Sequence, residues 1–305
     1  MKLSGILSLL MACATPSAMA ANIVWISDQI ADSNTPPALS DQGFVNLLTA
    51  AGHNVTRGFA APATRPAAAA LDAADLVIIG RSAGSASFSA GDNAAFWNGI
   101  TTPMLSTNPY ALRPTQLGWN TAANIVDQIS STVTFANPGS PASAYLIGSV
   151  PMTGSTTTNS LTEAITFYNG AADIRGTSIS TDTPVAGGTV IASTVVGAGP
   201  ATAAFIAFWP AGTVPSGTNP GQTFGDFRME FFAGNRESAT APVNSVPHAG
   251  YENLTANGEA MFLRAVNLAV NRGSVVPEPG STALAFAAGA LALSRRRRSA
   301  ASSRA

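Results

Sequence analysis

The chain of 305 residues has one cysteine, two histidines and one lysine, and each scarcity excludes a kind of chemistry. Cys13 lies in a segment that we expect to be removed, so the remaining protein offers no disulfide, no Cys-ligated zinc site and no cysteine nucleophile. The lysine is Lys2, which excludes a Schiff-base or P-loop lysine from the body. His53 and His248 are too few and too distant in sequence to indicate a histidine metal site. We therefore expect no metal and no cofactor.

Charged residues are also scarce, at 10% of the chain against 46% hydrophobic residues, a balance typical of a folded protein. Between residues 21 and 272, nine arginines stand against fifteen acidic residues, a formal charge of −6. Because an acidic surface repels phosphate backbones, no nucleic-acid partner is expected. The roughly 250 residues of this region can bury the core of one large domain or two small ones.

The first twenty residues carry the pattern of a secretory signal peptide. Lys2 gives a basic start, an apolar run follows, and residues 18–20 (Ala-Met-Ala) form a small-residue cleavage site. The pattern predicts export by the Sec machinery and cleavage by signal peptidase after residue 20. An alternative takes residues 10–13 (Leu-Met-Ala-Cys) as a lipoprotein box in which Cys13 becomes lipidated.

The end of the chain combines three elements in order. The first is Pro277, Glu278 and Pro279, the second is an apolar stretch over residues 283–293, and the third is Arg295, Arg296, Arg297 and Arg298. The apolar stretch predicts a hydrophobic helix, shorter than the ~20 residues that span a bilayer comfortably. The arginines would hold its carboxyl end on the cytoplasmic side.

This order resembles the PEP-CTERM sorting signal of Gram-negative bacteria. The resemblance implies cleavage near the Pro-Glu-Pro by an exosortase, a membrane protease, and delivery of the body to the cell surface or the exopolysaccharide matrix. The alternative is an ordinary tail anchor, or an Ala-rich helix that ends in basic residues by chance. We therefore divide the chain into a signal peptide (residues 1–20), a secreted α/β domain (residues 21–272) and a sorting tail (residues 273–305).

The first part of the body alternates strands and helices, which predicts right-handed crossovers and a mainly parallel sheet flanked by helices. The later part is rich in Gly, Ser and Thr and adds further strands before a final helix. The strands are expected at residues 22–27, 54–58, 75–80, 103–106, 132–135, 189–196 and 203–209, and the helices at 43–51, 65–74, around Phe96 and at 254–270.

Polar residues in two of these regions have expected local roles. Asp41 precedes the first helix and is a plausible cap. Asp226, Arg228 and Glu230 alternate with apolar residues and are expected to line the polar face of a strand.

The layout resembles the flavodoxin-like fold of class I glutamine amidotransferase-like and trehalose-utilisation-like proteins. The segments that carry the resemblance are residues 22–28, 75–82, 97–103 and 254–270. Catalytic amidotransferases use a cysteine nucleophile on a tight turn, and no position here matches it. The resemblance thus implies the fold without that chemistry.

A serine hydrolase is the catalytic hypothesis. Residues 80–84 read Gly-Arg-Ser-Ala-Gly directly after a predicted buried strand, and Ser82, Asp226 and His248 follow the chain order of an α/β-hydrolase triad. Against it, residues 85–91 are rich in Ser and Gly, few strands precede the motif, and no His-Gly-Gly-Gly segment lies upstream. We therefore keep the hydrolase as the alternative and expect no catalysis.

A second group of side chains follows the predicted strands at their carboxyl ends, where open α/β sheets bind ligands. Tyr110 and Trp119 would stack on a sugar ring while polar neighbours bond its hydroxyls. Alternatively, the aromatic rings cover the core and Arg113 pairs with an acid. The candidate ligand-binding residues are Asp28, Arg81, Asn108, Tyr110, Arg113 and Trp119.

Asp28, Asp32 and Asn34 offer oxygen ligands for calcium, but their spacing does not match an EF-hand loop.

Taken with the sorting tail and the scarcity of Cys, Lys and His, the sequence favours a secreted, non-catalytic protein with a structural or carbohydrate-binding role and extracellular polysaccharide as a partner.

Overall fold

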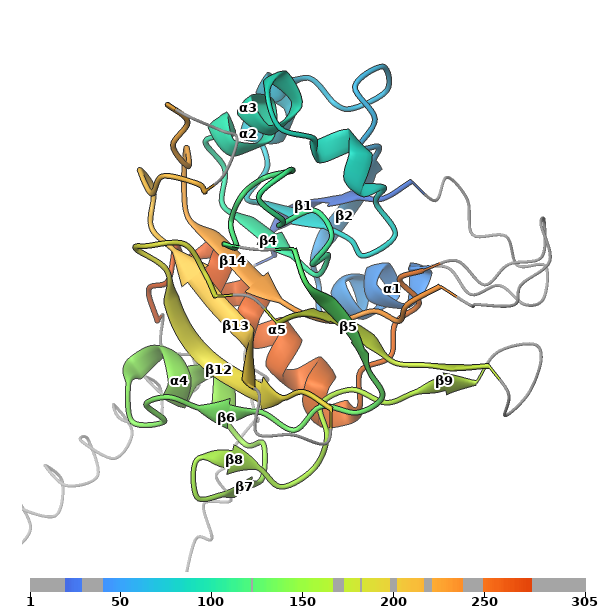
Figure 1. Ribbon diagram of the computed structural model, residues 1–305, viewed down its shortest axis with the longest axis vertical. Coiled ribbons are helices and arrows are strands. Elements are labelled where there is room, and N and C mark those ends of the chain that lie inside the picture. Colours follow the sequence, from blue (N-terminus) through green and yellow to red (C-terminus); the bar gives the residue numbers. More distant parts are fainter. Residues whose placement is uncertain are drawn as a thin grey trace, which may run out of the picture. The chain divides into compact units, whose positions relative to one another are not determined.

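The strands of the first half pair in parallel around a fully apolar centre. In the computed structural model, β3 (Leu76–Ile79) is buried along its whole length and lies between β1 (Asn22–Ile26) and β4 (Met104–Ser106). The strand β2 (Asn54–Gly58) pairs with the other side of β1, and β14 (Arg228–Phe231) joins beside β4. All four contacts are parallel, which confirms the predicted strands and their mode of pairing in this half (Figure 1).

The same sheet continues in antiparallel fashion beyond β14. Next to it lie β13 (Thr202–Trp209) and β12 (Thr189–Val195), which were predicted, followed by the short strands β6 (Thr134–Phe135), β8 (Thr156–Thr157) and β7 (Met152–Thr153). The complete order is β2-β1-β3-β4-β14-β13-β12-β6-β8-β7. The sheet is thus mixed, parallel over its first five strands and antiparallel over the others.

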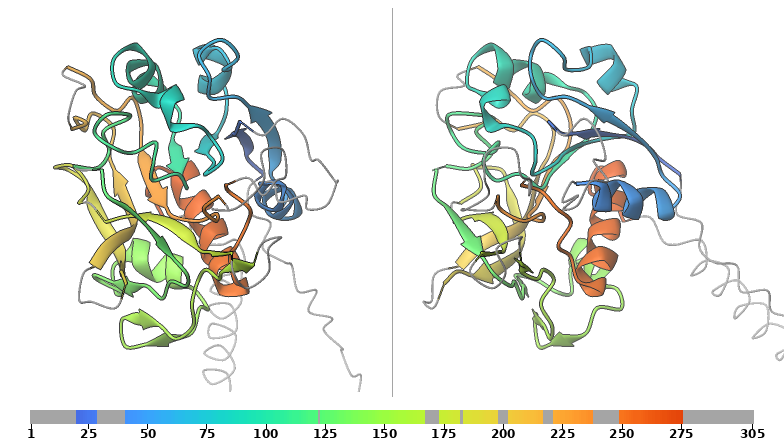
Figure 2. Two further views of the ribbon diagram at one scale, coloured as in Figure 1. Left: turned by 45° about the vertical axis from the view of Figure 1, so that its right-hand side comes forward. Right: turned by 90° about the vertical axis from the view of Figure 1, so that its right-hand side faces the viewer.

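Helices cover both faces of this sheet. On one face, α1 (Gln42–Ala50) and α5 (Ala256–Val270) lie side by side (Figure 2), and the Phe44 ring stacks on Trp25 of β1 and meets Phe262 of α5. On the other face lie α2 (Ala68–Asp72), shorter than the predicted helix 65–74, the 3-10 turn η1 (Ser85–Phe88) and α3 (Asp92–Gly99). A further helix, α4 (Pro141–Ile147), was not predicted and packs against α5.

Two small strand pairs accompany the main sheet. In one, β5 (Ile125–Gln128) pairs with β11 (Thr177–Ser180), and in the other β9 (Ile165–Thr166) pairs with β10 (Ile174–Arg175). None of the four was predicted. An isolated bridge between Thr177 and Asn235 places β11 next to the segment that follows β14.

The expected polar face of the strand at residues 228–231 is wrong, because both charged side chains of β14 are fully buried. Arg228 donates hydrogen bonds to the carbonyl oxygens of Asn98, Ile100 and Thr102 at 2.7–3.0 Å, so it fastens the end of α3 to the sheet. Burial lowers the pKa of Arg228 to about 9. The same loss of water raises the pKa of Glu230 to about 8.

The structure describes residues 20–28, 41–121, 123–166, 173–181, 183–197, 202–216, 221–237 and 249–275. The predicted signal peptide, apart from Ala20, and the apolar stretch of the tail lie outside these ranges. Within them, no helix combines the length and the apolar character that crossing a bilayer requires.

Candidate functional site

The strand order identifies a candidate ligand-binding edge between β1 and β3. In an open α/β sheet, ligands bind outside the carboxyl ends of the strands where the order reverses, and in the order β2-β1-β3-β4 that point lies between β1 and β3. Residues 27–28 follow β1, residues 80–84 follow β3, and residues 107–108 follow β4. Five of the six predicted ligand-binding residues gather around this edge.

The turn at residues 80–84 is fastened from both sides. Asp28 accepts a hydrogen bond from the Gly84 amide at 2.6 Å, and Asn108 Nδ2 donates to the carbonyl oxygens of Gly80 and Ala83 at 3.3 and 2.7 Å. A Cβ atom at Gly84 would lie 2.7 Å from the Asp28 carboxylate, so glycine permits this approach. Asp28 and Asn108 therefore shape the edge by holding its central turn.

Among the residues that the structure describes, the hydroxyl of Ser82 bonds to a serine and an aspartate. Its Oγ donates to Asp41 Oδ2 at 2.7 Å and lies 2.8 Å from Ser27 Oγ. Asp41 also accepts hydrogen bonds from Trp25 Nε1 at 2.6 Å and from Arg57 Nη1 at 2.7 Å. The expected capping role of Asp41 is wrong, because its side chain makes no capping bond to α1 and points into this network instead.

The position of Asp226 contradicts the proposed Ser82–Asp226–His248 triad. Asp226 precedes β14, which runs parallel to β3, so it lies at the amino-terminal edge of the sheet. There it pairs with Arg272 at 2.9 Å, and the length of β14, about 13 Å for four residues, separates the two edges. His248 lies outside the described residues. The histidine within them, His53, is at the amino-terminal edge beside Ala21.

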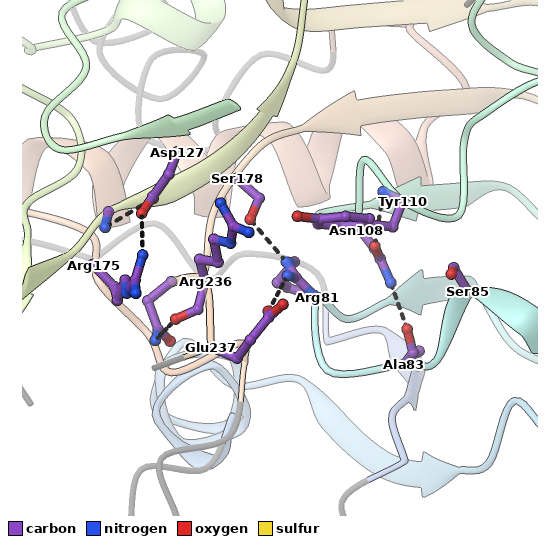
Figure 3. A network of polar contacts seen from close by, with 12 residues as sticks. Arg81, Ala83, Ser85, Asn108, Tyr110, Asp127, Arg175, Ser178, Arg236 and Glu237 are labelled. Carbon is purple, nitrogen blue, oxygen red and sulfur yellow. Dashed lines mark hydrogen bonds and ion pairs between the residues drawn. The ribbon is translucent and has the colours of Figure 1, made fainter. Parts of the chain in front are cut away.

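An arginine nearly without solvent contact anchors the other side of the edge (Figure 3). Arg81 is 7% exposed; its Nε donates to Ser178 Oγ at 3.2 Å and its Nη2 pairs with Glu237 at 2.7 Å. The guanidinium lies 4.4 Å from the centre of the Tyr110 ring, a cation–π contact. Burial lowers the pKa of Arg81. For Glu237, burial alone would raise the pKa, but the charges of Arg81 and Arg236, together with hydrogen bonds to the carboxylate, outweigh burial and lower it.

Tyr110 is also held by a second arginine. Arg113 Nε donates to the Tyr110 carbonyl at 3.0 Å, its Nη2 donates to Ser85 Oγ at 3.1 Å, and its guanidinium lies 5.4 Å from the Tyr110 ring centre. Tyr110 and Arg113 are both partly exposed. Their positions place an aromatic ring and two guanidinium groups next to the rigid turn.

A second charged group lies next to Arg81 on β10, β5 and the segment after β14 (Figure 3). Arg175 pairs with Asp173 at 3.0 Å and approaches Asp127 at 3.8 Å. Burial raises the pKa of Asp127, opposed by the Gly176 amide and by the charges of Arg236, Arg175 and Arg81. All three guanidinium groups therefore act on one carboxylate.

The predicted role of Trp119 is wrong. Its ring has no exposed surface and packs against Trp209 and Phe224, with ring centres 5.5 and 5.6 Å apart. Its Nε1 donates to Asn98 Oδ1 at 3.1 Å. Because the indole is part of the core, it offers no face to a sugar.

Several members of the site carry no signal in the sequence. Glu237 is 156 residues from Arg81, and Ser178 is 97 residues from it. Both reach Arg81 only because β11 and the end of β14 fold to the same edge. Asp32 and Asn34, considered as calcium ligands, lie outside the described ranges; within those ranges no group of three or more His, Cys, Asp or Glu side chains is arranged to hold a metal ion.

The tail of the chain matches a known family. The family model of the PEP-CTERM protein-sorting motif matches residues 275–298. The chain carries a PEP-CTERM sorting signal. This signal implies an exported protein that passes through a membrane-anchored stage and is processed by an exosortase, a membrane protease, before release at the surface.

The body is compared at the level of structure. The glutaminase domain of Trypanosoma brucei CTPS, solved with bound acivicin, is similar over 86% of this chain and 97% of that domain, with 11% identity and a TM-score of 0.38. The comparison with curated proteins gives no match.

Proposed function

We propose that the PEP-CTERM signal delivers a non-catalytic, saccharide-binding domain to the cell surface or the exopolysaccharide matrix of a Gram-negative bacterium. The sugar binds at the carboxyl edge of the parallel strands, beside Tyr110. The observation that carries this proposal is the convergence of Tyr110, Arg81 and Arg113 on the fastened turn at residues 80–84. A partly exposed aromatic ring beside fixed donors suits a sugar, which offers an apolar face and a rim of hydroxyl groups.

The state of Ser82 supports a binding role over catalysis. Activation of a serine requires a general base, and the acceptor for this hydroxyl is a carboxylate already paired with Arg57. In the part of the chain that the structure describes, no imidazole lies near Ser82. The network of Ser27, Asp41 and Ser82 instead ties β1, α1 and the turn after β3 together.

The experiment is a binding assay with the processed protein recovered from its producing cells. It is offered a panel of immobilised polysaccharides that includes the cells' own matrix. We expect binding that Tyr110→Ala weakens about tenfold, since an aromatic contact contributes up to ~1.5 kcal/mol beyond its buried area. Tyr145→Ala, which removes the same ring from α4, is the matched control and should leave affinity unchanged.

Two results would contradict the proposal. One is a folded protein that binds no member of the panel. The other is covalent labelling by a fluorophosphonate probe that disappears in Ser82→Ala, which would make the chain a surface serine hydrolase.

A further inference from the structure

We infer that the saccharide is acidic and that its carboxylate binds between the guanidinium groups of Arg81 and Arg236, at the place where Glu237 pairs with Arg81. This inference rests on the proposed function and assigns the chemical class of its ligand.

Arginine is concentrated at this edge although the domain as a whole is acidic. Between residues 21 and 272 there are nine arginines and no lysine, against fifteen acidic residues. Four of the nine belong to the site: Arg81 and Arg113 touch Tyr110, and Arg81, Arg175 and Arg236 all act on Asp127. The same edge holds four carboxylates, those of Asp28, Asp127, Asp173 and Glu237, so its formal charges cancel although the domain as a whole is acidic. The edge gains a net positive charge, which attracts an anion, when Glu237 turns toward solvent.

The four arginines differ in how far the fold neutralises them. Arg175 has two carboxylate partners and Arg81 has one. Within the described ranges, the hydrogen bonds of Arg113 go to a carbonyl and a hydroxyl, and neither Arg113 nor Arg236 enters an ion pair. The charge of Arg236 also acts unfavourably on Arg81. A carboxylate bound between these groups would relieve that repulsion and supply the missing acceptor.

Glu237 already occupies the position that a ligand carboxylate would take. Its carboxylate pairs with the nearly buried Arg81 at 2.7 Å, yet its own side chain is 53% exposed. The pair thus joins a fixed cation to an anion that can turn toward solvent at modest cost. A uronate offers the same planar carboxylate and would compete with Glu237 for Arg81. Removing the charge of Glu237 should therefore strengthen binding of an acidic sugar.

The test compares an oligogalacturonate with a neutral galactan fragment of equal length, titrated into the processed protein. We expect tighter binding of the acidic ligand, with an affinity that falls as salt is added. Glu237→Gln should raise affinity for the acidic ligand about threefold and leave the neutral one unchanged. Arg236→Gln should lower the acidic affinity about fivefold, the range of a solvent-exposed ion pair.

Two controls match these charge changes. Glu163→Gln removes an exposed carboxylate elsewhere, and Arg272→Gln removes a guanidinium at the opposite edge of the sheet. Neither should change affinity. Equal affinities for both ligands, insensitive to Arg236→Gln, would overturn the inference and leave saccharide binding intact. Weaker acidic binding in Glu237→Gln would overturn the competition with Arg81, and binding of neither ligand would refute the proposed function itself.

Discussion

Glu230 provides a quantitative test of how this fold treats buried charge. The side chain is fully buried in β14; its Oε2 accepts a hydrogen bond from Asn120 Nδ2 at 3.3 Å, and among the residues that the structure places its Oε1 has no partner. Burial raises its pKa from 4.5 to about 8, so the folded protein keeps the proton that the unfolded chain releases. Below pH 4.5 both states are protonated and the group costs nothing. As pH rises to about 8, stability falls.

The expected size follows from the shift. Between pH 4.5 and pH 7, an interval of about 2.5 pH units, the carboxyl is ionised in the unfolded chain and protonated in the folded protein. This difference destabilises the fold by about 3 kcal/mol at pH 7. Glu230→Gln removes the titration and keeps the shape, and its amide NH2 can serve Asn120 Oδ1, which also lacks a partner among the described residues. The variant should match the wild type near pH 4.5 and exceed its stability by about 3 kcal/mol at pH 7.

The assay is urea unfolding at a series of fixed pH values, with the free energy of unfolding taken from linear extrapolation. Parallel profiles for the wild type and Glu230→Gln would refute the reasoning, because they would mean that Glu230 titrates alike in the folded and unfolded states.

Two further predictions concern stability. Arg228→Leu should lower the free energy of unfolding in urea by about 3–5 kcal/mol, because it leaves the carbonyls at the end of α3 without a hydrogen-bond donor. Arg272→Gln, at an exposed ion pair, should lower it by less than about 1 kcal/mol. Equal losses would contradict the role of Arg228. Thr255→Ala should cost about 1 kcal/mol, since Thr255 Oγ1 accepts from the Gly258 amide and caps α5, and an unchanged unfolding midpoint would count against that cap.

The parallel half of the fold could be predicted because its central strand consists of consecutive apolar residues. Residues 76–79 (Leu-Val-Ile-Ile) are buried on both faces, and such strands are nearly continuous in apolar residues. The strand β14 was harder to predict, because the partners of Glu230 and Arg228 lie 110 and 130 residues earlier in the chain. Strands of two residues, such as β6 and β8, are too short to show a period.

The ends of the predicted strands were enough to predict part of the site. Asp28, Arg81 and Asn108 follow strands whose carboxyl ends meet at one edge, and the structure brings them to the same turn. The prediction for Trp119 was wrong because its neighbours in the core, Trp209 and Phe224, come from distant segments of the chain. No local pattern could have identified Glu237 as the partner of Arg81.

The most direct test of the account is the intact mass of the protein, measured separately in the membrane and extracellular fractions of the cells that make it. We expect an extracellular species that begins at Ala21 and ends near Pro277, with any added mass at its carboxyl end identifying what it is joined to. A species that keeps the four arginines at residues 295–298, found only in the membrane fraction, would contradict processing by an exosortase and with it delivery of the domain to the surface.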